Sequence, residues 1–262
     1  MNAFESRRVV VTRPAAQSGE MCGLLEAAGA VPILVPTVAI APPPSFEPLD
    51  RALRSAAEYD WLVFTSANGA RSVLRRATTL GLDLGRVANL RLAAVGPATR
   101  AVLNDAGLTV AAMPSVHRGD QIPESLGDVD GVRILLPRSD LADDTLPGLL
   151  RDVGAGVDEV AAYCTTLRAV TEAGLEALDE GVDAITFTSP STIRGLVEAL
   201  GVARAHVIEE SVVASVGPVT SKAARALGVR VDVEASESTS LGLVDALTTY
   251  EGWARHTSST AP

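Results

Sequence analysis

The stretch WLVFTS at Trp61–Ser66 returns as AITFTS at Ala184–Ser189, 123 positions later (184 − 61). In both copies a short apolar run ends in Thr-Ser. Short apolar runs bounded by polar residues are typical of strands that are buried on both faces. Such strands occur in parallel sheets that carry helices on both sides. The two stretches therefore predict the same strand-to-helix turn at two places in the chain.

Other elements recur in the same order along the chain. VVVTR at Val9–Arg13 matches ILLPR at Ile134–Arg138, a shift of 125 (134 − 9). AAVGPAT at Ala93–Thr99 matches ASVGPVT at Ala214–Thr220, a shift of 121 (214 − 93). The shifts differ by only a few residues, so the insertions fall in loops. The order indicates an internal duplication with a period of about 120 residues, which makes each copy one structural repeat.

The composition and the periodicity together predict an α/β protein. Hydrophobic residues make up 47% of the 262 residues but aromatic residues only 3%, so the core must consist mainly of aliphatic side chains. Helical patterns alternate with the apolar runs, and Gly follows several of them as a C-cap. Alternating strands and helices predict parallel sheets covered on both faces. Five strands per copy predict two flavodoxin-like or Rossmann-like layers.

The domain boundaries do not have to coincide with the boundary between the repeats. VPTVAIAPPPSFEP at Val35–Pro48 is rich in proline, and its counterpart is VAAYCTTLRAVT at Val160–Thr171. If both stretches cross between domains, each domain contains parts of both repeats and two linkers connect them. The sequence permits this arrangement without requiring it.

Charge and motif content exclude several classes of function. The net charge of −10 argues against nucleic-acid binding, which depends on Lys and Arg. The two cysteines, Cys22 and Cys164, suggest a reducing cytoplasm, and neither a signal peptide nor a membrane span is expected. Metal-ligand spacing and nucleotide-binding loop motifs are absent, so we expect no metal site. We expect the three histidines, His117, His206 and His256, to lie in solvated loops.

Polar residues follow the predicted strands of both copies, where open parallel sheets bind ligands. One interpretation is helix capping, because Ser and Thr accept hydrogen bonds from the first helical turn. The other is that helix N-termini and arginines form an anion site, for a ligand with many carboxylates or phosphates. The candidate residues are Arg13, Thr65, Ser66, Thr99, Arg138, Ser139, Ser189 and Thr220.

Tyr163 departs from the repeat symmetry, because it aligns with Val38 (163 − 125). A tyrosine at the end of a strand, where a linker begins, can be a packing residue. A phenol bordering a ligand site can also donate a proton as a general acid. Both interpretations remain open on the residues alone.

Several motifs in order resemble the uroporphyrinogen-III synthase family. They are WLVFTSANGA, AAVGPATRAVL, ILLPRSDLADDTLPGLL, VDEVAAYCT and ITFTSPSTIRGL, and the resemblance runs from about Val9 to Leu247. It departs from the family at VHRGDQIPESLGDVDG, Val116–Gly131, where an expected helix is weak and Pro123 limits its length.

The resemblance implies a fold of two flavodoxin-like domains, each discontinuous, joined by a two-stranded linker. It places residues 1–37 and 168–262 in one domain and residues 42–163 in the other, with linkers near 38–41 and 164–167. It also implies a cofactor-free enzyme that cyclises hydroxymethylbilane with loss of water and inversion of the last ring. Tyr163 is then the candidate proton donor, and the substrate carries eight carboxylates.

A second class of function is a non-catalytic binding or regulatory module with the same fold. The chain shows no basic patch and no helix-turn-helix pattern, which favours the enzyme. We expect a monomer, because no exposed apolar helix is apparent in the sequence.

Overall fold

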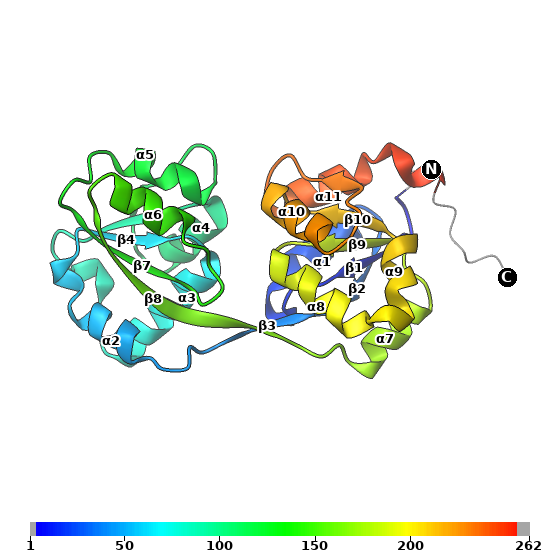
Figure 1. Cartoon of the computed structure of the whole chain (residues 1–262), viewed down its shortest axis with the longest axis horizontal. Coiled ribbons are helices and arrows are strands. Elements are labelled where there is room, and N and C mark those ends of the chain that lie inside the picture. Colours follow the sequence, from blue (N-terminus) through cyan, green and yellow to red (C-terminus); the bar gives the residue numbers. More distant parts are fainter. Residues whose placement is uncertain (1–3, 256–262) are drawn as a thin grey trace. The chain divides into compact units, whose positions relative to one another are not determined.

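The computed structural model describes residues 4–255 and divides the chain into two compact units (Figure 1). Unit 1 comprises Met1–Ala39 and Thr166–Pro262, and unit 2 comprises Ile40–Thr165. The chain thus passes between the units twice, after Ala39 and after Thr165. One detail differs from the expectation that both domains are discontinuous. Unit 2 is a single stretch of chain inserted into unit 1, because both passages bound the same central segment.

Unit 1 is built on a five-stranded sheet with the order β11-β10-β9-β1-β2, in which every adjacent pair is parallel. The strands are β1 (Arg8–Val11), β2 (Val31–Leu34), β9 (Ala184–Phe187), β10 (Val212–Ser215) and β11 (Val233–Glu234). The helices are α1 (Gly19–Ala27), α7 (Glu172–Asp179), α8 (Pro190–Leu200), α9 (Ala205–Glu210), α10 (Pro218–Ala226) and α11 (Ser240–Thr248). Short 3₁₀ turns lie at Ala15–Gln17, Val202–Arg204 and Glu251–Arg255.

The sheet of unit 1 is buried on both faces. Val9 and Val11 of β1 pack into one apolar cluster, and Val10 between them packs into another. The same alternation holds in β9, where Ala184 belongs to the first cluster and Ile185 to the second. Successive side chains of a strand point to opposite faces, so a continuous apolar run fits a strand covered by helices on both sides.

Unit 2 carries a six-stranded sheet with the order β3-β8-β7-β4-β5-β6, in which the start of β3 and the end of β8 extend into the residues of unit 1. The strands are β3 (Val38–Ala41), β4 (Trp61–Phe64), β5 (Arg91–Ala94), β6 (Val110–Ala112), β7 (Arg133–Ser139) and β8 (Gly156–Leu167), and those from β4 to β8 pair in parallel. The helices are α2 (Glu47–Arg54), α3 (Ala67–Thr79), α4 (Pro97–Asp105), α5 (Ile122–Leu126) and α6 (Thr145–Asp152). Short 3₁₀ turns lie at Ala56–Glu58, Leu84–Arg86 and Gly119–Gln121.

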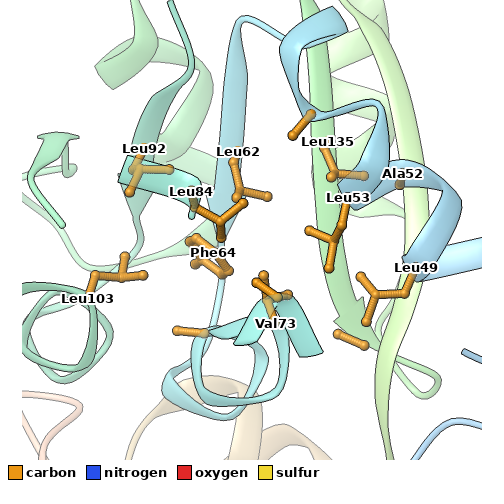
Figure 2. Packing of buried hydrophobic residues seen from close by; sticks show 14 of the residues in the cluster. Leu49, Ala52, Leu53, Leu62, Phe64, Val73, Leu84, Leu92, Leu103 and Leu135 are labelled. Atoms are coloured by element: carbon orange, nitrogen blue, oxygen red, sulfur yellow. The ribbon is translucent and has the colours of Figure 1, made fainter. Parts of the chain in front are cut away.

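Aliphatic residues and few aromatics fill the core of unit 2, as the composition predicts. Figure 2 shows one of its clusters, in which leucines of α2 and valine of α3 pack around Leu62 and Phe64 of β4. Trp61 and Val63, the alternate residues of the same strand, pack into a second cluster on the other face. The expected α/β class with two parallel sheets is therefore confirmed.

The region Val116–Gly131 holds the short helix α5, with Pro123 in its first turn. Pro is tolerated there because the first N–H groups of a helix have no intrahelical partner. Across residues 4–255, no helix is both long enough and apolar enough to span a membrane.

Candidate functional site

The site of unit 2 forms where β4, β7 and β8 carry polar residues at the carboxyl edge of the sheet. Ser66 follows β4 and caps α3, since its Oγ accepts a hydrogen bond from Gly69 N–H at 3.0 Å. Thr65 lies half-buried between the strand and the cap. The capping interpretation of Ser66 is thus confirmed.

A β-bulge directs Tyr163 into this site. Arg138 of β7 pairs with Ala161 of β8, but the next residue, Ser139, pairs with Tyr163, so Ala162 is an extra residue. Ala162 and Tyr163 consequently pack into the same apolar cluster although they are neighbours in one strand. Bulges re-aim side chains in this way. The phenol Oη of Tyr163 comes to lie 3.1 Å from Ser66 Oγ.

Gly69 lets the first turn of α3 lie close to Ser66 and to β7, with the tyrosine ring in ordinary contact beside it. A Cβ atom at Gly69 would lie 3.3 Å from Ser66 Oγ, 3.4 Å from the Pro137 carbonyl oxygen and 3.8 Å from Cε1 of Tyr163. The first turn of α3 therefore packs directly against β7 and the ring. The sequence marks this position only as a glycine in the first turn of a helix.

Burial raises the pKa of Tyr163 above its ordinary value of 10.0, because the phenolate would be desolvated. The hydroxyls of Ser66 and Ser139 act in the opposite direction, and the negative charge of Asp140 raises the pKa further. Only 8% of the residue is exposed. The phenol is therefore protonated at neutral pH and can act as a hydrogen-bond or proton donor.

Asp140 fixes the backbone around Tyr163. Its N–H donates to the Tyr163 carbonyl oxygen at 3.3 Å, and its Oδ1 accepts from Thr165 N–H at 3.0 Å. The Ser139 hydroxyl donates to the same carboxylate oxygen at 3.0 Å. This role of Asp140 could not be predicted from the sequence, because nothing in the spacing of Asp140 and Thr165 shows that two strand ends meet there.

Arg138 is held inside unit 2. It is only 8% exposed, and its guanidinium forms an ion pair with Glu159 at 2.8 Å and donates to the Asp143 carbonyl oxygen. Arg151 contacts the other oxygen of Glu159 at 2.8 Å. These contacts tie β7 and β8 to the loop before α6.

Thr99 and Thr220 occupy equivalent places in the first turns of α4 and α10. Both helices begin at Gly-Pro, and neither N-cap glycine can offer a capping side chain. Both threonines are 4% exposed, and within residues 4–255 neither hydroxyl has a hydrogen-bond partner, although neither oxygen is among the fully buried atoms that lack one. An unpaired hydroxyl beside free helix N–H groups suits an anionic ligand.

In unit 1, Ser189 follows β9 and caps α8, where its Oγ accepts from Thr192 N–H at 3.4 Å. Arg13 follows β1 and donates to the Ser240 hydroxyl at 3.0 Å. Ser240, at the start of α11, donates in turn to Glu20 of α1 at 2.9 Å. Ser240 lies outside the repeated motifs, so no sequence pattern indicates its contact with Arg13.

The predicted residues thus separate into two sets, each at the carboxyl edge of its own sheet. Among them, the structure brings Tyr163, Ser66 and Ser139 together, and it places Arg138 against Glu159 instead. Of the histidines, His117 lies in an exposed loop, His206 is exposed on α9 and so not in a loop, and His256 is outside the described residues. Within residues 4–255, no cluster of His, Cys, Asp or Glu could hold a metal ion.

The fold defines a class: an α/β protein with two parallel-sheet units and polar residues at the carboxyl edge of each sheet. A family model, Uroporphyrinogen-III synthase HemD, matches residues 19–245. The chain is 34% identical to a uroporphyrinogen-III synthase of Synechococcus elongatus, over 96% of this chain and 97% of that protein. It is 27% identical to one of Chlorobaculum parvum, over 87% and 92%. The chain belongs to the uroporphyrinogen-III synthase family, whose enzymes are cyclising lyases.

Solved structures share the fold at lower identity. A mutant uroporphyrinogen III synthase from Thermus thermophilus aligns with a TM-score of 0.64 at 23% identity, covering 96% of this chain and 100% of that chain. The enzyme from Helicobacter pylori aligns with a TM-score of 0.60 at 17% identity, covering 92% and 97%.

Proposed function

We propose that this protein is a uroporphyrinogen-III synthase. It closes the linear tetrapyrrole hydroxymethylbilane into a ring, inverts the last pyrrole ring and releases water. Within the structure, the observation that carries the proposal is the Tyr163 hydroxyl, which is neutral, shielded and held at the carboxyl edge of a parallel sheet. Membership of the family supports the same conclusion.

In the proposed reaction, Tyr163 protonates the terminal hydroxyl of the substrate. The C–O bond breaks, and its electron pair leaves with the water molecule. The adjacent pyrrole nitrogen supplies the electrons that form the azafulvene, which then cyclises through a spiro intermediate. The substrate releases a proton as the macrocycle is completed, and this proton restores the phenol.

Substrate binding is assigned to the strand-end residues. Thr99 and Thr220 are suited to carboxylate groups, because their hydroxyls have no hydrogen-bond partner within residues 4–255 and lie beside helix N-termini. Thr65, Ser139, Ser189 and Arg13 complete the proposed set. Arg138 is instead proposed to support the fold, because Glu159 and the Asp143 carbonyl oxygen already engage its guanidinium. Holding a reactive linear chain in one conformation is itself a large catalytic effect.

We further propose that the two compact units are the domains of the enzyme, that the two sequence repeats arose by duplication, and that no cofactor takes part. The net charge of −10 supports a small-molecule substrate rather than a nucleic acid. A monomer in the cytoplasm remains the expectation.

The direct test supplies hydroxymethylbilane, oxidises the products and separates the porphyrin isomers. The proposal expects the type III isomer. Formation of the symmetric type I isomer alone, as in the spontaneous reaction, would leave the non-catalytic binding module as the better description.

A further inference from the structure

The hydroxyl of Ser66 can donate one hydrogen bond and accept two. The structure shows which of these positions are occupied. One acceptor position takes the N–H of Gly69 at 3.0 Å, which is the cap of α3. The remaining contact is with the phenol of Tyr163 at 3.1 Å. Within residues 4–255, no other group forms a hydrogen bond with this hydroxyl. Its proton therefore has one acceptor in that part of the chain, the Oη of Tyr163.

The direction of this bond matters when Tyr163 loses its proton. A neutral phenol can accept from Ser66 or donate to it, but a phenolate can only accept. A bond from Ser66 to Tyr163 leaves the phenol O–H free to point at a substrate. The same bond shortens and strengthens when its acceptor becomes charged.

Ser139 is not equivalent to Ser66, although both lower the pKa of Tyr163. The Ser139 hydroxyl donates to the Asp140 carboxylate at 3.0 Å, so its proton is already engaged. Asp140 is the charged group that acts on the phenol, and it disfavours the phenolate. Ser66 is the hydroxyl left to stabilise negative charge there, and it stands at the positive N-terminus of α3.

We propose that Ser66 is a positioning residue for Tyr163: its hydroxyl orients the phenol as a donor and stabilises the phenolate after proton transfer. The chain of contacts runs from Gly69 N–H to Ser66 Oγ and from Ser66 O–H to Tyr163 Oη. The proton of Ser66 stays on its oxygen throughout, and the proton of Tyr163 is the one that is transferred. Ser66 then acts through Tyr163 rather than on a substrate carboxylate. The inference rests on the proposed function.

The test compares Ser66→Gly and Ser66→Thr with wild type. Gly removes the hydroxyl but is a tolerated N-cap, and Thr keeps both the cap and the donor. We expect Ser66→Gly to lower kcat by about 10- to 100-fold, the usual scale for a hydrogen bond to a charged group, with KM nearly unchanged. Ser66→Thr restores kcat.

A matched control separates capping from positioning. Thr171 caps α7 in the same manner, with its Oγ1 accepting from Gly174 N–H at 3.2 Å, and among the described residues no tyrosine forms a hydrogen bond with it. Thr171→Gly is expected to leave kcat unchanged. An equal loss of kcat in Thr171→Gly and Ser66→Gly would assign Ser66 to capping alone.

A double-mutant cycle gives the decisive comparison. In a Tyr163→Phe background, adding Ser66→Gly should cause no further loss of kcat, because the hydroxyl no longer has a phenol to act on. A full additional loss of kcat in the double variant overturns the inference. A rise in KM at constant kcat in Ser66→Gly alone also overturns it, because that result would show that Ser66 contacts the substrate directly.

A readout without substrate separates this inference from the proposed function. The pKa of Tyr163 can be followed by NMR of ¹³Cζ-labelled tyrosine, assigned with Tyr163→Phe. Ser66→Gly should raise the pKa of Tyr163, and Ser66→Thr should leave it unchanged. An unchanged pKa in Ser66→Gly contradicts the inference even if the wild type forms type III porphyrin. A wild type that forms only type I contradicts the proposed function instead.

Discussion

Thr37 and Gly195 lie in such close contact that a Cβ atom on Gly195 would stand 2.6 Å from the Thr37 carbonyl oxygen. Thr37 is fully buried, and its hydroxyl donates to the Thr192 carbonyl oxygen of α8 at 2.9 Å. Its own carbonyl accepts from Arg168 N–H at 2.9 Å. Thr37 lies just before the first passage between the units, and Arg168 lies just after the second. Their hydrogen bond therefore joins the two linker segments to each other within unit 1.

Gly195→Ala is therefore expected to lower the free energy of unfolding, although Ala normally favours a helix. Overpacking against backbone costs about 1–3 kcal/mol. Gly23→Ala in α1 is the control, since nothing lies within 4 Å of its added Cβ atom, and it should stabilise by up to about 1 kcal/mol. Chemical denaturation of both variants provides the comparison, and equal stabilisation by the two substitutions would show that α8 can move away from Thr37.

Tyr163→Phe should reduce turnover about 100-fold, at the lower end of general acid catalysis, because the leaving hydroxyl can also depart unaided. The ring stays in its apolar cluster, so the thermal midpoint should change little. Initial rates with hydroxymethylbilane and a melting curve test both points. An unchanged rate would show that Tyr163 is a packing residue and not the proton donor.

Thr99→Val and Thr220→Val should each raise KM, by about tenfold if the lost bond reaches a carboxylate. Stability should be nearly unaffected, since neither hydroxyl has a partner within residues 4–255. Steady-state kinetics and denaturation on the same preparations separate the two effects. Lower stability with an unchanged KM would reveal an internal role for the hydroxyls.

Arg138→Met should destabilise unit 2, by about 1–2 kcal/mol, because it leaves Glu159 with a single cationic partner in a partly buried place. The exposed Arg51, paired with Glu47 on the surface of α2, gives the control. Arg51→Met should change the free energy of unfolding by no more than about 0.5 kcal/mol. If Arg138→Met raises KM without loss of stability, its guanidinium is a substrate contact.

Alkaline pH should weaken the fold through Tyr59. Burial, followed by the hydrogen bond to Asp158 at 2.8 Å and the charge of that residue, raises the pKa of Tyr59 from 10.0 to about 12. Between these values the folded state keeps a proton that the unfolded chain has lost, so stability falls as pH rises from about 10 to about 12. Denaturation at several pH values should show a shallower decline in Tyr59→Phe. The same slope in both proteins would contradict the assignment.

The architecture could be predicted from the sequence to a large extent, because it depends on local patterns. Runs of four mainly apolar residues such as Trp61–Phe64 and Ala184–Phe187 are strands in the structure. The repeated Thr-Ser ends are helix starts, with Ser66 and Ser189 as N-caps. Both signals lie within a few residues of chain, where hydrogen bonding and side-chain periodicity are decided.

Contacts between distant residues set the chemistry of the site and could not be predicted. Tyr163 contacts Ser66 because β8 carries one extra residue opposite Arg138 and Ser139. No feature of the sequence VDEVAAYCT predicts that bulge. The sequence predicts Arg138 as a ligand-binding cation, but its partner Glu159 lies 21 positions away on the neighbouring strand, so the ion pair could not be predicted from local sequence.

The amino-acid sequence by itself determined the repeat, the strands and helices, and the polar residues that follow each strand. Only the tertiary structure decided which of these groups form hydrogen bonds or ion pairs with distant residues. The reason is physical: periodicity and capping act over a few residues, whereas strand register, burial and the pKa of a phenol depend on what the rest of the chain packs against it.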